Sequence, residues 1–342
     1  MIFQPCSSSL CQFDKAATTP IIFFEIAVLV LAIFFIFYLS RYTKKILLKF
    51  FIIAIGIFIF EFITHPLWYN FKMGEWAYVY RDVSWLLTIG WATIILTTTV
   101  VIDHLLPKVR AYKRFFLYLL ATLIIGLIGE TVVMQLGIRS YSPETHQLIG
   151  NLYIPLLGIP WGSLYYIPVF MALVIGFYKY WSLVIDNKIL LPIKKIKWGR
   201  YLAVSVVGVL LFEVMIDAMI SNAGLPAWSY IFRDINIILT ISWIIIIWLA
   251  ILFVDKVFIH FDLFKKFISY ILLATAIALP IEAIFVAKNI RIYSPSTTEN
   301  FSGYLVPFSS VPVEVIFVFP FYLALIIGFI KYWTYTFENK EL

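Results

Sequence analysis

Five glutamates stand in or beside long apolar stretches of this sequence, where a charged carboxylate is costly. Glu61, Glu130, Glu213 and Glu282 lie within such stretches, and Glu314 opens the last one. Ionisable residues at membrane depth are functional candidates by default. Apolar surroundings disfavour the charged form of a carboxyl group, so such an acid can stay protonated and donate its proton. We therefore expect the catalytic residues among Glu282, Glu314, Glu130 and Glu213.

Arginine and aromatic residues recur beside these acids. Arg81 and Arg233 follow the stretches that hold Glu61 and Glu213, and each could form a buried ion pair with that glutamate. Aromatic faces can stabilise a cation formed on a substrate. We expect the substrate to bind among eight residues: Glu61, Arg139, Arg291, Arg81, Arg233, Trp161, Tyr141 and Tyr293.

Two other polar pairs also have structural interpretations. Asp82 and Asp234 stand where helix N-caps belong, at the positive end of the helix dipole. Arg139 and Arg291 either anchor an interfacial loop or pair with a glutamate. The sequence leaves these alternatives open.

The sequence carries no recognisable motif for a metal or a cofactor. Its four histidines and two cysteines have no metal-ligand spacing. No phosphate loop, dinucleotide fingerprint or nucleophile elbow is present. We therefore expect neither a metal nor a cofactor. Cys6 and Cys11 could pair if the N-terminus lies outside the cell, and the sequence does not decide this.

The elements that must position these residues are membrane-spanning helices. Of the 342 residues 63% are hydrophobic and 13% are charged, and the mean hydropathy is +0.96. Soluble domains are about 45–50% apolar and about 25% charged. Long unbroken apolar stretches predict an all-α, polytopic transmembrane bundle with about nine spans rather than a β-barrel. The spans are expected at 21–40, 46–64, 83–102, 115–136, 161–183, 201–220, 235–254, 267–287 and 313–335.

Basic residues concentrate in alternate loops. The loops after the first, third, fifth and seventh spans are rich in Lys and Arg, and the loops between them are poorer. The positive-inside rule then predicts a multi-pass protein of the cell membrane with its N-terminus outside and its C-terminus in the cytoplasm. This pattern accounts for the net charge of +7, so we expect no nucleic-acid partner.

The chain repeats itself with an offset of 152 residues, which is the separation of Glu61 from Glu213 and of Glu130 from Glu282. The register holds without a gap from about 58 to 188, which indicates a duplication. Each repeat holds four spans, so the two are expected to be parallel, with one extra helix before them. The predicted domains are an outer tail with the extra span at 1–45, a first repeat at 46–190 and a second repeat at 191–342.

Two short motifs of the second repeat resemble a known family. Residues 280–285 and 312–317 share the pattern Pro-x-Glu-x-Ile-Phe. They look like the Pro-x-Glu-Glu-x-x-Phe-Phe segments of the membrane-embedded, heterodimer-type lycopene cyclases. The first repeat is similar to the carotenoid hydratase membrane family, in which a span glutamate (here Glu130) precedes a Gly-x-Pro turn (here residues 158–160). The resemblance implies that Glu282 donates a proton and Glu314 stabilises a cation, with Glu130 and Glu213 in support.

Three functions remain open on these grounds. The first is a lycopene cyclase-like isomerase or carotenoid hydratase, which performs redox-neutral cyclisation, isomerisation or hydration on a carotenoid or another polyprenoid lipid. The second is a transporter or lipid carrier, because parallel repeats with polar groups between them suit alternating access. The third is a non-catalytic scaffold or receptor. The expected partners are the membrane and a hydrophobic lipid or polyene, and the oligomeric state stays open.

Overall fold

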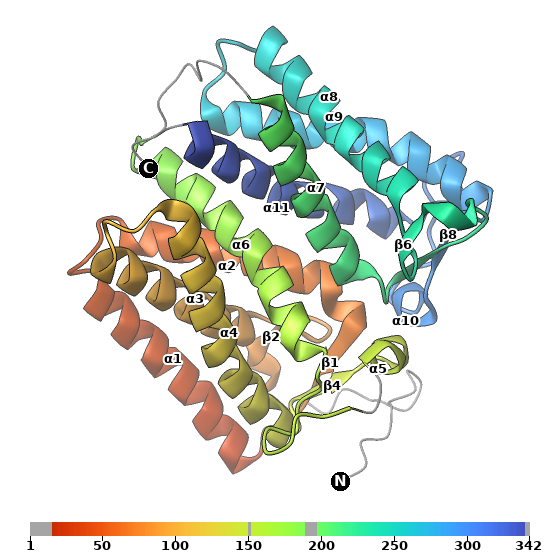
Figure 1. The fold of residues 1–342 in the computed structure, drawn as a ribbon. Helices are drawn as coiled ribbons and strands as arrows, with labels where there is room; N and C mark the ends of the chain where they lie inside the picture. The colour runs from red at the N-terminus through yellow and green to blue at the C-terminus, as the bar shows by residue number, and fades with distance from the viewer. Residues whose placement is uncertain (1–15, 150–151, 189–196, 339–342) are drawn as a thin grey trace. The chain divides into compact units, whose positions relative to one another are not determined.

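A computed structural model describes residues 16–149, 152–188 and 197–338. The chain divides into two compact units, the first reaching Tyr178 and the second beginning at Lys179. Figure 1 shows the helices and the short strands of each unit.

Nine helices of the described residues are long and apolar enough to cross a membrane. In the first unit they are α1 (Thr19–Leu39), α2 (Ile46–Thr64), α3 (Trp85–Leu105), α4 (Ala111–Gln135) and α6 (Ser163–Ile185), whose last turns enter the second unit. In the second unit they are α7 (Trp198–Ile216), α8 (Ile237–Val257), α9 (Leu263–Ala287) and α11 (Val313–Glu338). The prediction of an all-α protein with about nine spans is confirmed.

The secondary structure repeats with the same offset as the sequence. Helices α7, α8 and α9 begin and end 152 residues after α2, α3 and α4. Within the first unit α3 packs against α1, α2 and α4, and within the second unit α11 packs against α7 and α9. The parallel orientation of the two repeats stays a prediction.

Short strands, which the hydropathy did not predict, join the helix ends. In the first unit β1 (Trp68–Asn70) pairs antiparallel with β4 (Arg139–Tyr141), and β2 (Tyr78–Tyr80) pairs with β3 (Val83–Ser84). The second unit repeats both pairs with β5 (Ile220–Asn222) and β8 (Arg291–Tyr293), and with β6 (Tyr230–Phe232) and β7 (Ile235–Asn236). Two short helices, α5 (Pro143–Ile149) and α10 (Pro295–Thr298), follow β4 and β8.

The expected helix caps at Asp82 and Asp234 are wrong. Ser84 caps α3, because its Oγ accepts from the backbone N–H of Leu87 at 3.3 Å. Asn236 caps α8 in the same way, with Oδ1 accepting from the N–H of Ile238 at 2.9 Å. Each aspartate instead belongs to a two-residue turn between paired strands, so two strand residues separate it from the helix.

Helix α1 is attached to the first repeat by a buried carboxylate. Glu25 is 2% exposed, and its Oε1 accepts from the backbone N–H of Gly74 at 2.6 Å. Gly74 lies in the loop between β1 and β2. The helix therefore has a specific polar contact to the loop as well as its packing against α3.

Candidate functional site

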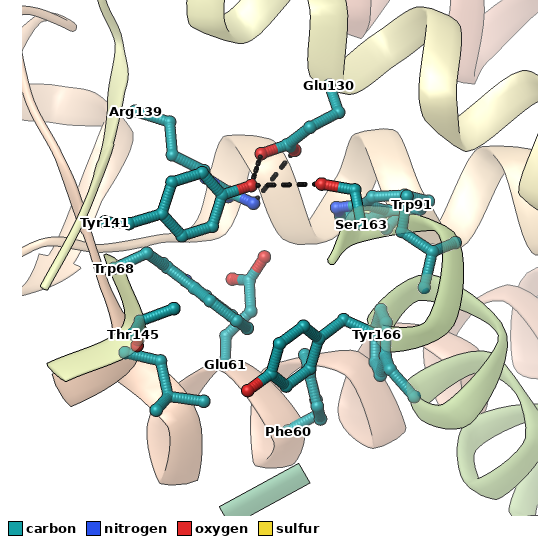
Figure 2. Close-up of a pocket in the computed structure, with 13 residues that line it drawn as sticks. Phe60, Glu61, Trp68, Trp91, Glu130, Arg139, Tyr141, Thr145, Ser163 and Tyr166 are labelled. Atoms are coloured by element: carbon teal, nitrogen blue, oxygen red, sulfur yellow. Dashed lines mark hydrogen bonds and ion pairs between the residues drawn. The ribbon is translucent and has the colours of Figure 1, made fainter. Parts of the chain in front are cut away.

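A buried cluster of charged and polar side chains lies where α4 meets the β1–β4 pair in the first unit (Figure 2). Arg139 donates from Nη1 to Glu130 Oε2 at 3.1 Å and from Nε to Asn70 Oδ1 at 3.1 Å. The Tyr141 hydroxyl donates to Glu130 Oε1 at 2.9 Å and lies 3.5 Å from Ser163 Oγ. Both oxygens of Glu130 therefore have a donor. A buried ion pair is tolerated when its members are hydrogen-bonded in this way.

The turn after α4 brings Arg139 back to Glu130. Gly137 has a φ of +67°, a conformation that glycine adopts without strain. The N–H groups of Ile138 and Gly137 then donate to the carbonyls of Val133 and Met134, each at 3.0 Å. This is the Schellman arrangement that ends many helices. It reverses the chain, so β4 runs back beside the end of α4 and pairs Arg139 with Asn70 of β1.

A cavity opens beside this cluster, with about 50 Å³ of space open to water-sized molecules. A single water needs about 10–15 Å³ on this scale, so the cavity holds a few waters or one end of an elongated apolar molecule. Its polar groups come from Glu61, Glu130, Arg139, Tyr141, Thr145 and Ser163. Its aromatic walls come from Phe60, Trp68, Trp91, Tyr166 and Phe170.

Glu61 supplies the one carboxyl oxygen of this lining that has no hydrogen-bond partner among the described residues. Its Oε2 accepts from Thr88 Oγ1 at 2.7 Å, whereas its Oε1 is buried and unpartnered. The side chain is 4% exposed, and Figure 2 shows its carboxyl group pointing toward Glu130 and Arg139. Leaving a buried acceptor unsatisfied costs about 1–3 kcal/mol. The Oε1 atom is therefore well placed to carry a proton or to meet a ligand.

The pKa values of two groups outside the spans are shifted from their ordinary values. Burial, and then the neighbouring Glu130 carboxylate, raise the pKa of Tyr141 well above its ordinary value, so Tyr141 remains a hydrogen-bond donor. Burial raises the pKa of the Asp82 carboxyl to about 7. Asp82 Oδ2 is buried without a hydrogen-bond partner in the described structure, which is consistent with a protonated group.

The second unit repeats the acidic cluster with a different geometry. Arg291 Nε lies 3.3 Å from Glu282 Oε1, and the Tyr293 hydroxyl donates to the same oxygen at 2.8 Å. Thr240 Oγ1 donates to Glu213 Oε2 at 2.6 Å. Both members of the Arg291–Glu282 pair are buried. The predicted residues Glu213, Glu282, Arg291 and Tyr293 thus belong to the second unit's copy of the cluster.

The remaining predicted residues lie away from the lining of the first unit's cavity. Glu314 is the second residue of α11 and accepts from the N–H of Ser302 at 2.5 Å. Arg233 lies 3.6 Å from Asp217 Oδ2. The Arg81 guanidinium lies over the ring of Tyr80, 5.4 Å from its centroid. Trp161 is 49% exposed.

The sequence interpretation missed several polar residues of both units. The missed residues that hold or face the acids of the first unit are Asn70, Thr88 and Ser163. The available signal was that Asn70 and Thr88 have identical counterparts in the second repeat, whereas Ser163 does not. In the second unit Lys331 is buried within α11, where Nζ donates to Asp255 Oδ2 at 3.1 Å and to the Tyr270 hydroxyl at 3.2 Å. A lysine inside an apolar span, repeated in both halves, was the available signal.

Within residues 16–149, 152–188 and 197–338, no group of three or more His, Cys, Asp or Glu could hold a metal ion. Cys6 and Cys11 lie outside the described residues.

The nine apolar helices define a multi-pass helical membrane protein, and the buried acids give its first unit a polar cavity with aromatic walls. Comparisons with protein-family models, with curated proteins and with solved structures found no match.

Proposed function

We propose that the protein is an integral membrane enzyme that performs redox-neutral acid–base chemistry on a carotenoid or another polyprenoid, by cyclisation, isomerisation or hydration. The observation that carries this proposal is the unpartnered Oε1 of Glu61, which faces a cavity with aromatic walls. The resemblance of residues 280–285 and 312–317 to lycopene cyclase motifs supports the same substrate class. We assign the proton donor to Glu61 rather than to Glu282 or Glu314, because Glu61 lines the cavity.

The proposed reaction begins with proton transfer from Glu61 to a carbon–carbon double bond. The O–H bond of the acid breaks and a C–H bond forms, which leaves a carboxylate and a carbocation. The rings of Trp68, Trp91 and Phe170 line the cavity, and in this proposal they stabilise that cation. The cation then returns a proton to a carboxylate, or it adds water and releases a proton. No electron is gained or lost overall, so the reaction needs no redox cofactor.

Glu130 supplies a fixed negative charge in this proposal. Arg139 and Tyr141 hold its two oxygens, so the carboxylate does not reorient when a cation forms nearby. Preorganised charges of this kind stabilise a developing charge more than mobile water does. Arg139 and Tyr141 are positioning residues, because they act through Glu130.

The size of the cavity limits what can enter it. About 50 Å³ of open space admits one end of a long isoprenoid chain and not the whole molecule. The rest of a polyprenoid would extend from the cavity along the apolar surfaces of the helices. The reaction is therefore expected at a terminal isoprene unit.

The experiment that tests this proposal uses a host that accumulates lycopene. Wild-type protein is expected to give a new carotenoid, detected by chromatography and mass spectrometry against an empty vector. An unchanged mass would indicate cyclisation or isomerisation, and a gain of one water would indicate hydration. Glu61→Gln is expected to lower the conversion by about 100-fold or more, the usual contribution of a positioned acid.

The matched control is Glu213→Gln, the same change in the second unit. It is expected to retain most of the conversion, because Glu213 is not part of the cavity lining. Full conversion by Glu61→Gln would contradict the proposed donor. An unchanged lycopene profile with correctly inserted wild-type protein would contradict the carotenoid substrate.

We also propose that the N-terminus lies outside the cell and the C-terminus in the cytoplasm. The support is the concentration of Lys and Arg in alternate loops together with the odd number of candidate spans among the described residues. In this orientation the Glu61–Glu130 cavity lies at the outer ends of the spans.

A transporter is the second candidate, because the second unit also buries charge near the opposite ends of its helices. The Lys331 side chain is 7% exposed and pairs with Asp255, two residues before the end of α8. Intramembrane ionisable pairs of this kind mark proton and substrate pathways. Uptake into proteoliposomes that depends on pH and on Glu130 would favour this function over the enzyme.

A further inference from the structure

Each unit has two glutamates at equivalent positions, but one wall beside these glutamates consists of different residues in the two units. In the first unit this wall belongs to α6, and in the second unit it belongs to α11. The α6 residues that line the cavity are Ser163, Tyr166, Ile167 and Phe170. The residues 152 positions later are Val315, Val318, Phe319 and Tyr322.

The changed residues of α11 form a close aromatic group. The ring centroids of Tyr322 and Phe212 are 4.4 Å apart, and those of Tyr322 and Phe319 are 5.2 Å apart. Trp243 contacts both rings, at 5.6 Å from Phe319 and 5.4 Å from Tyr322. Phe319 is 6% exposed and Tyr322 is 3% exposed. These rings therefore pack against one another in the interior of the second unit.

The first unit lacks one member of this group. Phe170 stacks on Phe60 at 3.5 Å and meets Trp91 at 5.9 Å, as Tyr322 meets Phe212 and Trp243. Ile167 stands where the second unit has Phe319. The first unit also has Tyr166 where the second has Val318, so the two walls carry the same number of rings at different positions. Ile167 lines the cavity and is smaller than Phe319, and in a close-packed interior the smaller side chain leaves space at this position.

We propose that the first unit holds the working site and that the second unit is its closed structural copy. Ile167 keeps the cavity open, and Phe319 closes the corresponding space. The size of the residue at position 167 then determines how far the end of a substrate can reach toward Glu61. The inference rests on the proposed function for the nature of the substrate, but not for the cavity itself.

Thiol labelling in native membranes tests the openness of each site without a substrate. Ser163→Cys and Val315→Cys are made separately in full-length protein whose Cys6 and Cys11 are replaced by Ser. Both new thiols occupy the same repeat position and are buried in the parent structure. The membranes are treated with methyl methanethiosulfonate, which forms a disulfide with the thiol and releases sulfinate, and the unmodified thiol is quantified after denaturation.

The cysteine at 163 is expected to react at least about tenfold faster than the cysteine at 315, because a filled site is reached only through rare local opening. Adding Ile167→Phe is expected to slow labelling at 163 by a similar factor. Adding Phe319→Ile is expected to speed labelling at 315. Val169→Phe adds a ring to α6 outside the cavity lining and is expected to leave the rate at 163 unchanged.

Equal labelling rates at 163 and 315, or an unreactive cysteine at 163, would overturn the inference. So would a labelling rate at 163 that Ile167→Phe leaves unchanged, provided that the variant still runs as a single species on size exclusion. The conversion of lycopene separates this inference from the proposed function. The expected labelling with an unchanged lycopene profile would retain the open site and reject the substrate. If the cysteines at 163 and 315 are labelled at equal rates, but lycopene is converted and Glu61→Gln abolishes the conversion, the proposed function is retained and the closed second unit is rejected.

Discussion

At the scale of single residues, Arg139 holds three groups at once. Its guanidinium donates to Glu130 and to Asn70, and it lies over the ring of Trp68 at 5.2 Å from the centroid. A planar fork of donors is suited to such simultaneous contacts, and a lysine ammonium is not. The second unit has Ile220 in place of Trp68, so Arg291 has no ring at this position.

The ion pairs show what sequence can and cannot predict at this scale. Glu61, Glu130 and Arg139 were recognisable as candidates, because charged residues in apolar stretches are conspicuous. Their pairing was not predictable, since both Arg81 and Arg139 were available to the glutamates. The reversal at Gly137 decides it by folding Arg139 back onto Glu130.

The prediction at the scale of single residues concerns Asp82. Burial raises the pKa of its carboxyl group to about 7. An unfolded aspartate has a pKa of about 3.9, so folding favours the protonated form. The associated stability is complete below pH 4 and is lost as the pH rises through 7. The loss is on the order of 4 kcal/mol, from about three pKa units. Asp82→Asn should therefore raise the melting temperature at pH 8 and flatten its decline between pH 5 and pH 8.

Melting of the detergent-solubilised protein across this pH range is the measurement. Asp234→Asn is the matched control, because it makes the same change in the less buried turn of the second unit. A melting temperature that rises with pH in the wild type would contradict the assignment. So would a decline that Asp82→Asn leaves unaltered.

At the scale of elements, α1 is the spanning helix that precedes the two repeats and belongs to neither. Its span has a mean hydropathy of 2.8 and is 17% buried, so most of its surface faces outward from the first unit. Its packing partner is α3, and Glu25 adds the contact to Gly74. The hydrogen bond adds a directional contact to the apolar packing of α1.

We predict that Glu25→Ala weakens the attachment of α1 by about 1.5–3 kcal/mol, the usual contribution of a hydrogen bond to a charged group. Glu25→Gln keeps an acceptor at the same place and should lose less. Limited proteolysis between α1 and α2, followed in detergent over time, measures this attachment. Equal cleavage rates for the Ala and Gln variants would show that the Gly74 contact is not the attachment.

Helices were predictable from the sequence because length and hydropathy define a span almost completely. The strands were not, since each has only two or three residues and shows no alternating pattern. The helix caps were predicted at the wrong residues because these strands were not foreseen. Asp82 and Ser84 are both good capping residues, and only the unforeseen β2–β3 turn assigns Asp82 to the turn and Ser84 to the helix.

At the scale of the whole molecule, the duplication provides an internal comparison. The two units share the bounds of three spans and the glutamates of the clusters. The positions at which they differ therefore point to a difference in role. Sequence alone revealed the duplication and placed the family-like motifs in the second repeat, but it did not decide which repeat holds the working site. The cavity could not be predicted, because it depends on how Ile167 and Phe170 pack against other side chains.

The proposed orientation gives the whole-molecule prediction. Single cysteines at Trp228, which is 75% exposed, and at Lys108, which is also exposed, report the two sides of the membrane. In intact cells a membrane-impermeant maleimide should label Trp228→Cys and spare Lys108→Cys until the cells are permeabilised. The opposite pattern would place the N-terminus inside, and the cavity would then lie at the cytoplasmic ends of the spans.

The contact between Glu25 and Gly74 also has a consequence for the synthesis of the chain. Gly74 follows Glu25 by 49 residues, which a ribosome adds in roughly 2–10 s at about 5–20 residues per second. Helix α1 is apolar enough to enter the membrane as soon as it emerges, but the group that binds its carboxyl does not yet exist. Insertion of the first span and its docking are therefore separate events, and the time needed to translate residues 25 to 74 is the shortest interval between them.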